Sequence, residues 1–166
     1  DTRRSNHYIA QDLGLSNPLL IQVMKPILTG AARSVASILI GMMVITFVAE
    51  TIEFVLIAVL NGGILTDQEA YFAVRNRSGV LVTKLFYNGG AAFLGGYVAA
   101  LIAGKSEVSY GLALAGFQLL GFVYGMTDPE ISGTIPDWMW IAIIVTMMPL
   151  IVFGAIIRSR RKSSSS

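Results

Sequence analysis

Cysteine is absent from the sequence, histidine occurs once, at His7, and only 13% of the 166 residues are charged. The lack of cysteine excludes disulfides, thiolate metal sites, iron–sulfur ligation and cysteine catalysis. One histidine does not suffice, from this chain alone, for a multi-histidine metal site or a histidine-ligated haem. The net charge of +2 is small, and the basic residues flank apolar runs, which argues against nucleic acid as a partner.

Hydrophobic residues make up 54% of the chain, which is above the usual share in soluble domains. Four apolar runs approach the roughly 20 residues that cross about 30 Å of hydrocarbon. The third is short and reaches across only with the help of residues 107–109. The runs are rich in Gly, Ala, Leu and Met and do not alternate in polarity, so they are not barrel strands. The sequence predicts an all-α polytopic membrane protein, a four-helix bundle over 35–158 with spans at 35–60, 80–103, 110–126 and 138–157.

The ends of the chain are more polar. Residues 1–34 show no small-residue cleavage site after a short apolar core, so they do not resemble a signal peptide. The stretch "SNPLLIQVMKPILTG" predicts a short interfacial helix capped by Asn17 and ended or kinked at Pro26. This helix either lies on the membrane or packs against protein. The basic and serine-rich tail, 159–166, is read as a topology signal, with contact to anionic lipid as the alternative.

Basic residues near the spans predict the orientation, because lysine and arginine collect on the cytoplasmic side. Nine of the twelve fall on the side that carries both termini. We therefore expect a bacterial inner membrane protein with cytoplasmic N and C termini. Trp138 and Trp140 follow Pro136 at the start of the last span, where indole rings commonly anchor a helix. The nine are Arg3, Arg4, Lys25, Arg33, Lys105, Arg158, Arg160, Arg161 and Lys162; the other three are Arg75, Arg77 and Lys84.

Small residues recur every four positions in the second span, which lets neighbouring helix backbones approach closely. They form two ridges, so this helix is predicted to contact two neighbours and to lie at the centre of the bundle. The alternative, a substrate path along the glycines, lacks a continuous polar stripe. The second-span ridges are Ala92, Gly96, Ala100 and Gly104 on one face and Ala91, Gly95, Ala99 and Ala103 on the other; the third span adds Gly111 with Ala115 and Gly121 with Gly125.

The segment "FLGGYVAALIAG", followed by a small-residue helix and "PDWMWIAIIVTMMPLIVFGAIIR", resembles a widespread group of small, uncharacterised bacterial four-helix membrane proteins. The resemblance covers about residues 34–158. Met139 and Ala155 depart from the pattern, where a tyrosine and a second glycine are usual. The resemblance implies the four-helix topology and a bacterial origin, and it implies no catalytic residue. The matching residues are Gly95, Gly96, Tyr97, Ala99, Ala100, Pro136, Trp138, Pro149 and Gly154.

Two carboxylates interrupt the first span, Glu50 and Glu53. At about 1.5 Å of rise per residue, they lie roughly 4 and 8 Å to the outer side of the midplane. The antiparallel second span places Asn88 at about 5 Å and Lys84 at about 11 Å on the same side. The sequence therefore predicts an intramembrane polar cluster with two matched pairs, Glu53 with Lys84 and Glu50 with Asn88. The predicted cluster consists of Glu50, Glu53, Lys84, Asn88 and Gln118.

A charge at the centre of a membrane helix costs about 3 kcal/mol, so the two carboxylates need an explanation. Three hypotheses supply one. In the first, the cluster is architectural and the chain is a non-catalytic accessory or scaffolding subunit, bound to other integral membrane subunits and lipids in, for example, a photosynthetic or respiratory complex. In the second, a small oligomeric channel or proton- or cation-coupled transporter uses Glu50 and Glu53. The third, a metal or acid–base enzyme, lacks the histidines of di-iron bundles.

The tyrosines, including Tyr71 and Tyr87, are read as interfacial anchors or packing groups. We predict no enzyme, no metal and no cofactor, although a lipid, quinone or pigment at the apolar surface is compatible with the sequence.

Overall fold

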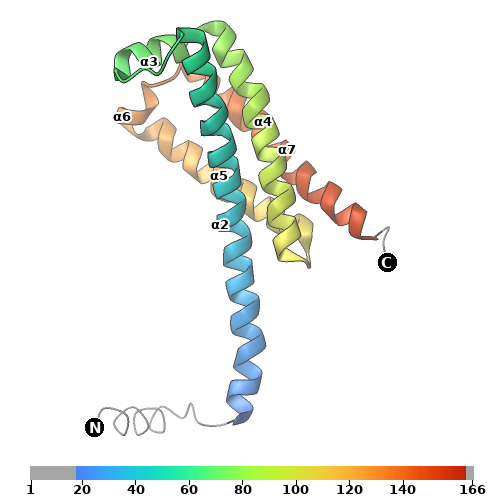
Figure 1. The fold of residues 1–166 in the computed structure, drawn as a ribbon. Helices are drawn as coiled ribbons and strands as arrows, with labels where there is room; N and C mark the ends of the chain where they lie inside the picture. Colours follow the sequence, from blue (N-terminus) through green and yellow to red (C-terminus); the bar gives the residue numbers. More distant parts are fainter. Residues whose placement is uncertain (1–17, 164–166) are drawn as a thin grey trace, which may run out of the picture. The chain divides into compact units, whose positions relative to one another are not determined.

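A computed structural model describes the backbone of residues 18–163 and the side chains from residue 30 onward. This part of the chain contains helices and turns and no strand (Figure 1). Four of its helices are long and apolar enough to cross a membrane. The prediction of an all-α, multi-pass membrane protein is thereby confirmed. The elements are α2 (Pro18–Asn61), α3 (Gln68–Arg75), α4 (Ser78–Ala103), α5 (Glu107–Thr127), α6 (Pro129–Ser132) and α7 (Asp137–Ser163).

Helix α2 differs from the prediction at its start. The structure has one helix, Pro18–Asn61, that includes Pro26, where the sequence predicts the end or a kink of a separate interfacial helix. Proline removes one backbone hydrogen bond, and helices of membrane proteins tolerate this loss where neighbouring groups satisfy the freed carbonyl. His7, the Asn17 cap and the end of the serine tail lie outside the described residues. The chain divides into two compact units, residues 1–35 and 36–166, and all contacts that follow lie within the second.

Local chemistry sets the boundaries of the shorter elements. Asp67 caps α3 by accepting a hydrogen bond from the backbone N–H of Ala70 at 3.2 Å, and Asp128 caps α6 in the same way. Gly104 ends α4 with φ of 65°, a left-handed conformation that glycine adopts without strain. Helix α5 begins at Glu107, so residues 107–109 do lengthen the short third span.

Helix α4 packs between α2 and α7 through small residues on two faces. A Cβ added to Gly95 would meet the Gly41 carbonyl oxygen at 2.7 Å, on α2. A Cβ added to Gly96 would overlap the backbone of Ile151, on α7. The buried Ser37 hydroxyl of α2 donates a hydrogen bond of 2.7 Å to the carbonyl of Ala99, which adds a polar link to this close contact. Small residues on α4 therefore position the other helices around it.

Gly121 and Trp140 do not have the environments that the sequence predicts for them. Gly121 is exposed, and a Cβ added to it would meet nothing within 4 Å, so it packs against no neighbouring helix in the second unit. Its partner in the predicted pair, Gly125, is buried against the ring of Trp140. Trp140 is itself only 8% exposed, whereas Trp138 is 51% exposed. Only Trp138 is thus accessible as an interfacial anchor.

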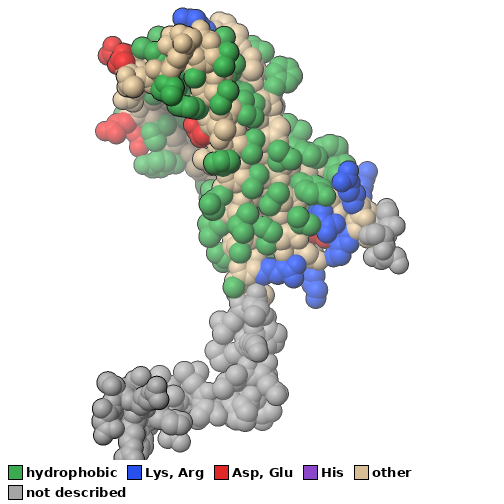
Figure 2. Space-filling model, viewed as in Figure 1, with side chains coloured by type: hydrophobic (Ala, Val, Ile, Leu, Met, Phe, Trp, Pro, Cys, Tyr) green, Lys and Arg blue, Asp and Glu red, His purple; other side chains and the backbone are tan. Residues whose placement is uncertain are grey.

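Basic side chains gather at one end of the second unit. Lys and Arg side chains gather toward the C-terminal end of α7, and hydrophobic side chains cover much of the face that Figure 2 shows. At this end Lys162 donates a hydrogen bond to the carbonyl of Gly104 and lies 3.3 Å from the buried carboxylate of Glu107. Helices α3 and α6 lie together at the opposite end, where the Asn76 amide donates a hydrogen bond of 3.0 Å to the carbonyl of Thr134 (Figure 1).

Candidate functional site

Side chains from two helices, α3 and α4, converge on the carboxylate of Glu53 in α2, which is only 2% exposed. Lys84 and the Tyr87 hydroxyl, both on α4, donate hydrogen bonds to Oε2, the latter at 2.6 Å. On the other oxygen, Oε1, the Tyr71 hydroxyl of α3 donates at 3.1 Å and Nε of Arg75 forms an ion pair at 2.8 Å. Each carboxylate oxygen thus has one cation and one phenol beside it. We call these five residues the Glu53 cluster.

Arg75 completes the Glu53 cluster without full hydrogen bonding. Its Nε is buried and close to Glu53, yet the N–H does not point at an acceptor. The guanidinium carbon lies 5.4 Å from the centroid of the Phe72 ring, a cation–π contact that holds its plane. Arg75 therefore contributes mainly charge to Glu53 and retains an unused donor.

Helical spacing explains how these residues come together. Tyr71 and Arg75 are four apart on α3, and Lys84 and Tyr87 are three apart on α4, so each pair shares one helix face. Helix α3 is only eight residues long, and its Asp67 cap fixes where it begins. Because α3 lies over the end of α2, it covers Glu53 from the side that α4 leaves open.

Opposite charges and hydrogen bonds stabilise the buried carboxylate of Glu53. Two cations and two phenols face one carboxylate, so burial is offset by charge-assisted hydrogen bonds on both oxygens. Burial and the adjacent carboxylate raise the pKa of Tyr71 to about 12. The phenol therefore remains a donor at physiological pH. Glu53, with its oxygens occupied and its surface buried, offers no lone pair to a substrate.

A polar cavity of about 200 Å³ lies beside the Glu53 cluster. Its charged lining residues are Glu50, Arg75 and Lys84, and apolar groups from α2, α5 and α7 form the rest of the wall. The uncharged polar lining residues are Thr46, Asn88, Thr134 and Gln118, and Trp140 adds an indole ring. The lining therefore includes every residue of the predicted polar cluster except Glu53, which Lys84 contacts.

Of the two predicted pairs, one forms and the other does not. Glu53 pairs with Lys84 as the depth comparison indicates. Glu50 does not pair with Asn88: the amide of Asn88 donates instead to the backbone carbonyl of Lys84, one turn back, at 2.8 Å. Glu50 is exposed, and within residues 30–163 we find no hydrogen bond to its carboxylate. Gln118 is half-buried and lines the same cavity.

Three members of the Glu53 cluster were missed by sequence reasoning. Tyr71 and Tyr87 were read as anchors, and Arg75 as a charge of the outer loop. The signal for Tyr87 was its position three residues after Lys84, on the face already assigned to the cluster. For Tyr71 and Arg75 the only signal was their spacing on a short amphipathic helix, which does not say where that helix docks.

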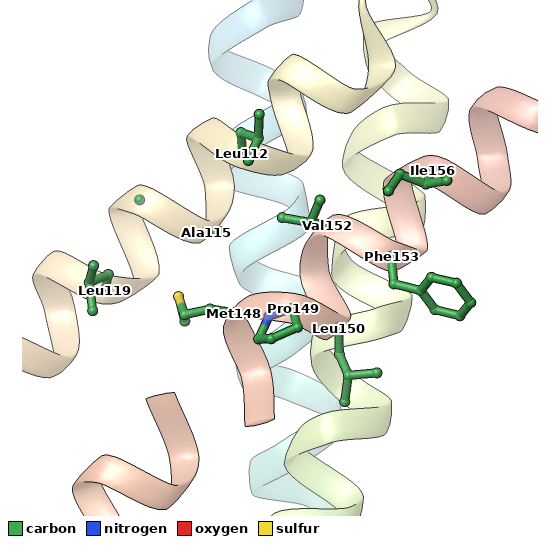
Figure 3. A pocket seen from close by; sticks show the side chains of 10 residues that line it. Leu112, Ala115, Leu119, Met148, Pro149, Leu150, Val152, Phe153 and Ile156 are labelled. Atoms are coloured by element: carbon green, nitrogen blue, oxygen red, sulfur yellow. The ribbon is translucent and has the colours of Figure 1, made fainter. Parts of the chain in front are cut away.

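An apolar groove of about 680 Å³ is lined by residues of α5 and α7 (Figure 3). Leu112, Ala115 and Leu119 of α5 lie along one side, and Met148 and Val152 of α7 lie along the other. Pro149, inside α7, has no N–H to donate along the helix.

Among the described residues no group of three or more histidine, aspartate or glutamate side chains is placed to hold a metal ion. Comparison of the chain with protein-family models, with curated proteins and with solved structures finds no match in any of the three.

Proposed function

We propose that this chain is a non-catalytic subunit of a larger complex of integral membrane proteins. One observation carries the proposal: Glu50 is exposed within a span, and no described residue hydrogen-bonds its carboxylate. It lies roughly 16 Å from the end of α2 at a rise of 1.5 Å per residue. A partner helix that brings a donor to Glu50 completes the site.

The energetics favour a covered Glu50. An ionised side chain near the centre of a membrane helix costs on the order of 3 kcal/mol when it lacks a partner. Glu53 meets this cost with four neighbours inside the chain, whereas Glu50 has none within hydrogen-bonding distance in the described part. A polar group of another subunit is the simplest source of the missing contact.

The exposure of the spans fits the same role. Half of the apolar window of α4 is buried, but only 22% in each of α2 and α5. Large apolar surfaces of α2 and α5 are therefore available to partners and lipids. We extend the proposal to an energy-transducing complex of a bacterial inner membrane. The charge bias around the spans supports cytoplasmic termini. The groove between α5 and α7 is where a lipid, quinone or pigment would lie.

Purification in a mild detergent from the native membrane tests the subunit role. The wild-type chain should co-purify with other membrane subunits at fixed stoichiometry. Glu50→Leu removes the carboxylate and should release those subunits, while Glu69→Gln on α3, exposed and outside the spans, should keep them. A wild-type chain that purifies alone as a symmetric oligomer contradicts the proposal.

The polar cavity favours a second candidate, a small oligomeric channel or a proton- or cation-coupled transporter. Glu50 is its exposed carboxylate, and the cavity is wide enough to hold several waters. Reconstituted protein should then conduct protons or cations, and Glu50→Gln should abolish the flux. No flux above that of empty vesicles, together with stoichiometric co-purification, leaves the subunit role.

A further inference from the structure

Three residues in the lining of the polar cavity beside the Glu53 cluster carry N–H donors with no acceptor among the described residues. Lys84 carries three N–H donors, of which one reaches Glu53, and Nε of Arg75 is buried with no acceptor. Asn88 spends one amide hydrogen on the Lys84 carbonyl, which leaves the other. The charged acceptor in the lining is the exposed carboxylate of Glu50, and the amide oxygens of Asn88 and Gln118 are neutral acceptors. An anion inside the cavity would satisfy donors that the chain itself leaves unused.

The walls are built to hold such a ligand. Lys84 is 6% and Asn88 9% exposed, so their polar groups are fixed within the bundle and not on its surface. Both line the cavity together with Arg75, whose side chain is 16% exposed. Desolvated donors in a low-dielectric site bind an anion more strongly than the same groups do in water.

Charge balance links anion binding to a proton on Glu50. Around the cavity, α2 contributes Glu50 and Glu53, α3 contributes Arg75 and α4 contributes Lys84. These four groups sum to zero when Glu50 is ionised and to +1 when it is protonated. The phenols of the Glu53 cluster stay neutral, and α5, α6 and α7 place no charged side chain in the lining. A monovalent anion restores neutrality only when Glu50 carries a proton.

The size of the cavity restricts the ligand. At about 30 Å³ per water, 200 Å³ holds roughly six or seven water molecules. This is below the roughly 300 Å³ at which pockets for drug-sized ligands begin. A halide or a short carboxylate fits, and a nucleotide or a quinone ring does not.

We propose that the cavity binds one small monovalent anion between Lys84, Arg75 and Asn88, together with one proton on Glu50. The anion then supplies the negative charge that a protonated Glu50 side chain does not carry. This inference goes beyond the subunit role and concerns the purified chain, so it stands or falls independently of any partner.

Iodide quenching of Trp140 fluorescence tests the proposal, because Trp140 lines the cavity and Trp138 is the only other tryptophan. In a Trp138→Phe background, in nanodiscs of neutral lipid, iodide should quench the emission saturably. The apparent Kd should rise with pH, by up to tenfold per pH unit, since one proton accompanies each anion. Glu50→Gln should bind iodide with a Kd that does not change with pH, and Lys105→Met, an exposed change outside the cavity, should behave as the parent.

Two results would overturn the proposal. Quenching that rises linearly to the highest iodide concentration shows collision without a site. Saturable quenching whose Kd is independent of pH in the Trp138→Phe parent shows a site that is not coupled to Glu50. Because Glu50 is exposed and makes no hydrogen bond within residues 30–163, Glu50→Gln preserves the fold and keeps the comparison interpretable.

Discussion

The pairing of Glu53 with Lys84 can be measured as a coupling free energy. Removing one partner of a buried ion pair costs about 3–5 kcal/mol, because the other charge is left buried and uncompensated. In Lys84→Met, Arg75 and both phenols still face Glu53. The loss should therefore approach that of one charged hydrogen bond, about 1.5–3 kcal/mol.

Glu53→Gln should cost more, because it leaves two cations, Lys84 and Arg75, beside a neutral amide. We expect about 3–5 kcal/mol. In the double variant only one buried cation remains without a carboxylate, and the Gln side chain still accepts from the phenols. The double variant should lose less than the sum of the single losses, with a coupling free energy of at least about 2 kcal/mol.

Reversible unfolding of the protein in mixed micelles, followed by circular dichroism as the denaturing detergent is titrated, supplies the four free energies of the cycle. Lys105→Met is the matched control, since it removes an exposed lysine and should change stability by less than about 0.5 kcal/mol. Losses that add to within about 0.5 kcal/mol would refute the coupling between Glu53 and Lys84.

Three further predictions follow from other contacts. Gly96→Val should destabilise the bundle by about 1–3 kcal/mol in the same unfolding assay, because its side chain meets the backbone of α7, whereas Gly121→Val should be nearly neutral. Tyr71→Phe should be less stable than wild type below pH 10, because it lacks the hydroxyl that donates to Glu53. This difference in stability should vanish as pH rises through the raised pKa of about 12, where the phenol loses its proton. Lys162→Met should raise amide hydrogen exchange at the α4–α5 turn, where its ammonium group binds the α4 cap, without changing exchange around Glu53.

The helices themselves were largely predictable. Apolar length predicts four spans, and the structure has four helices of sufficient length and hydropathy in its described part. The two small-residue ridges predict that this helix has two close neighbours, and Gly95 and Gly96 do face different helices. The exact partners do not follow, since a ridge says how closely a neighbour approaches and not which neighbour it is.

The sequence did not predict where the short helix α3 docks, or which acceptor the Asn88 amide binds. Nothing in the sequence of α3 states that Tyr71 and Arg75 cover Glu53. Asn88 matches Glu50 in depth, but an amide can also donate to its own helix backbone. In the structure the Asn88 amide donates to the carbonyl of Lys84. At Pro26 the sequence predicts that the helix ends or kinks, and in the structure the helix continues past this residue.

Glu50 and Glu53 differ in fate because of helix geometry. Three residues correspond to about 300° of rotation, so their side chains point about 60° apart on α2. That angle directs Glu53 between α3 and α4, where two cations and two phenols bind it. It directs Glu50 to the exposed side of the cavity, within the field of the same cations but beyond their hydrogen bonds. Glu53 therefore holds three helices together, and Glu50 remains the carboxylate that can respond to a proton, an anion or a second subunit.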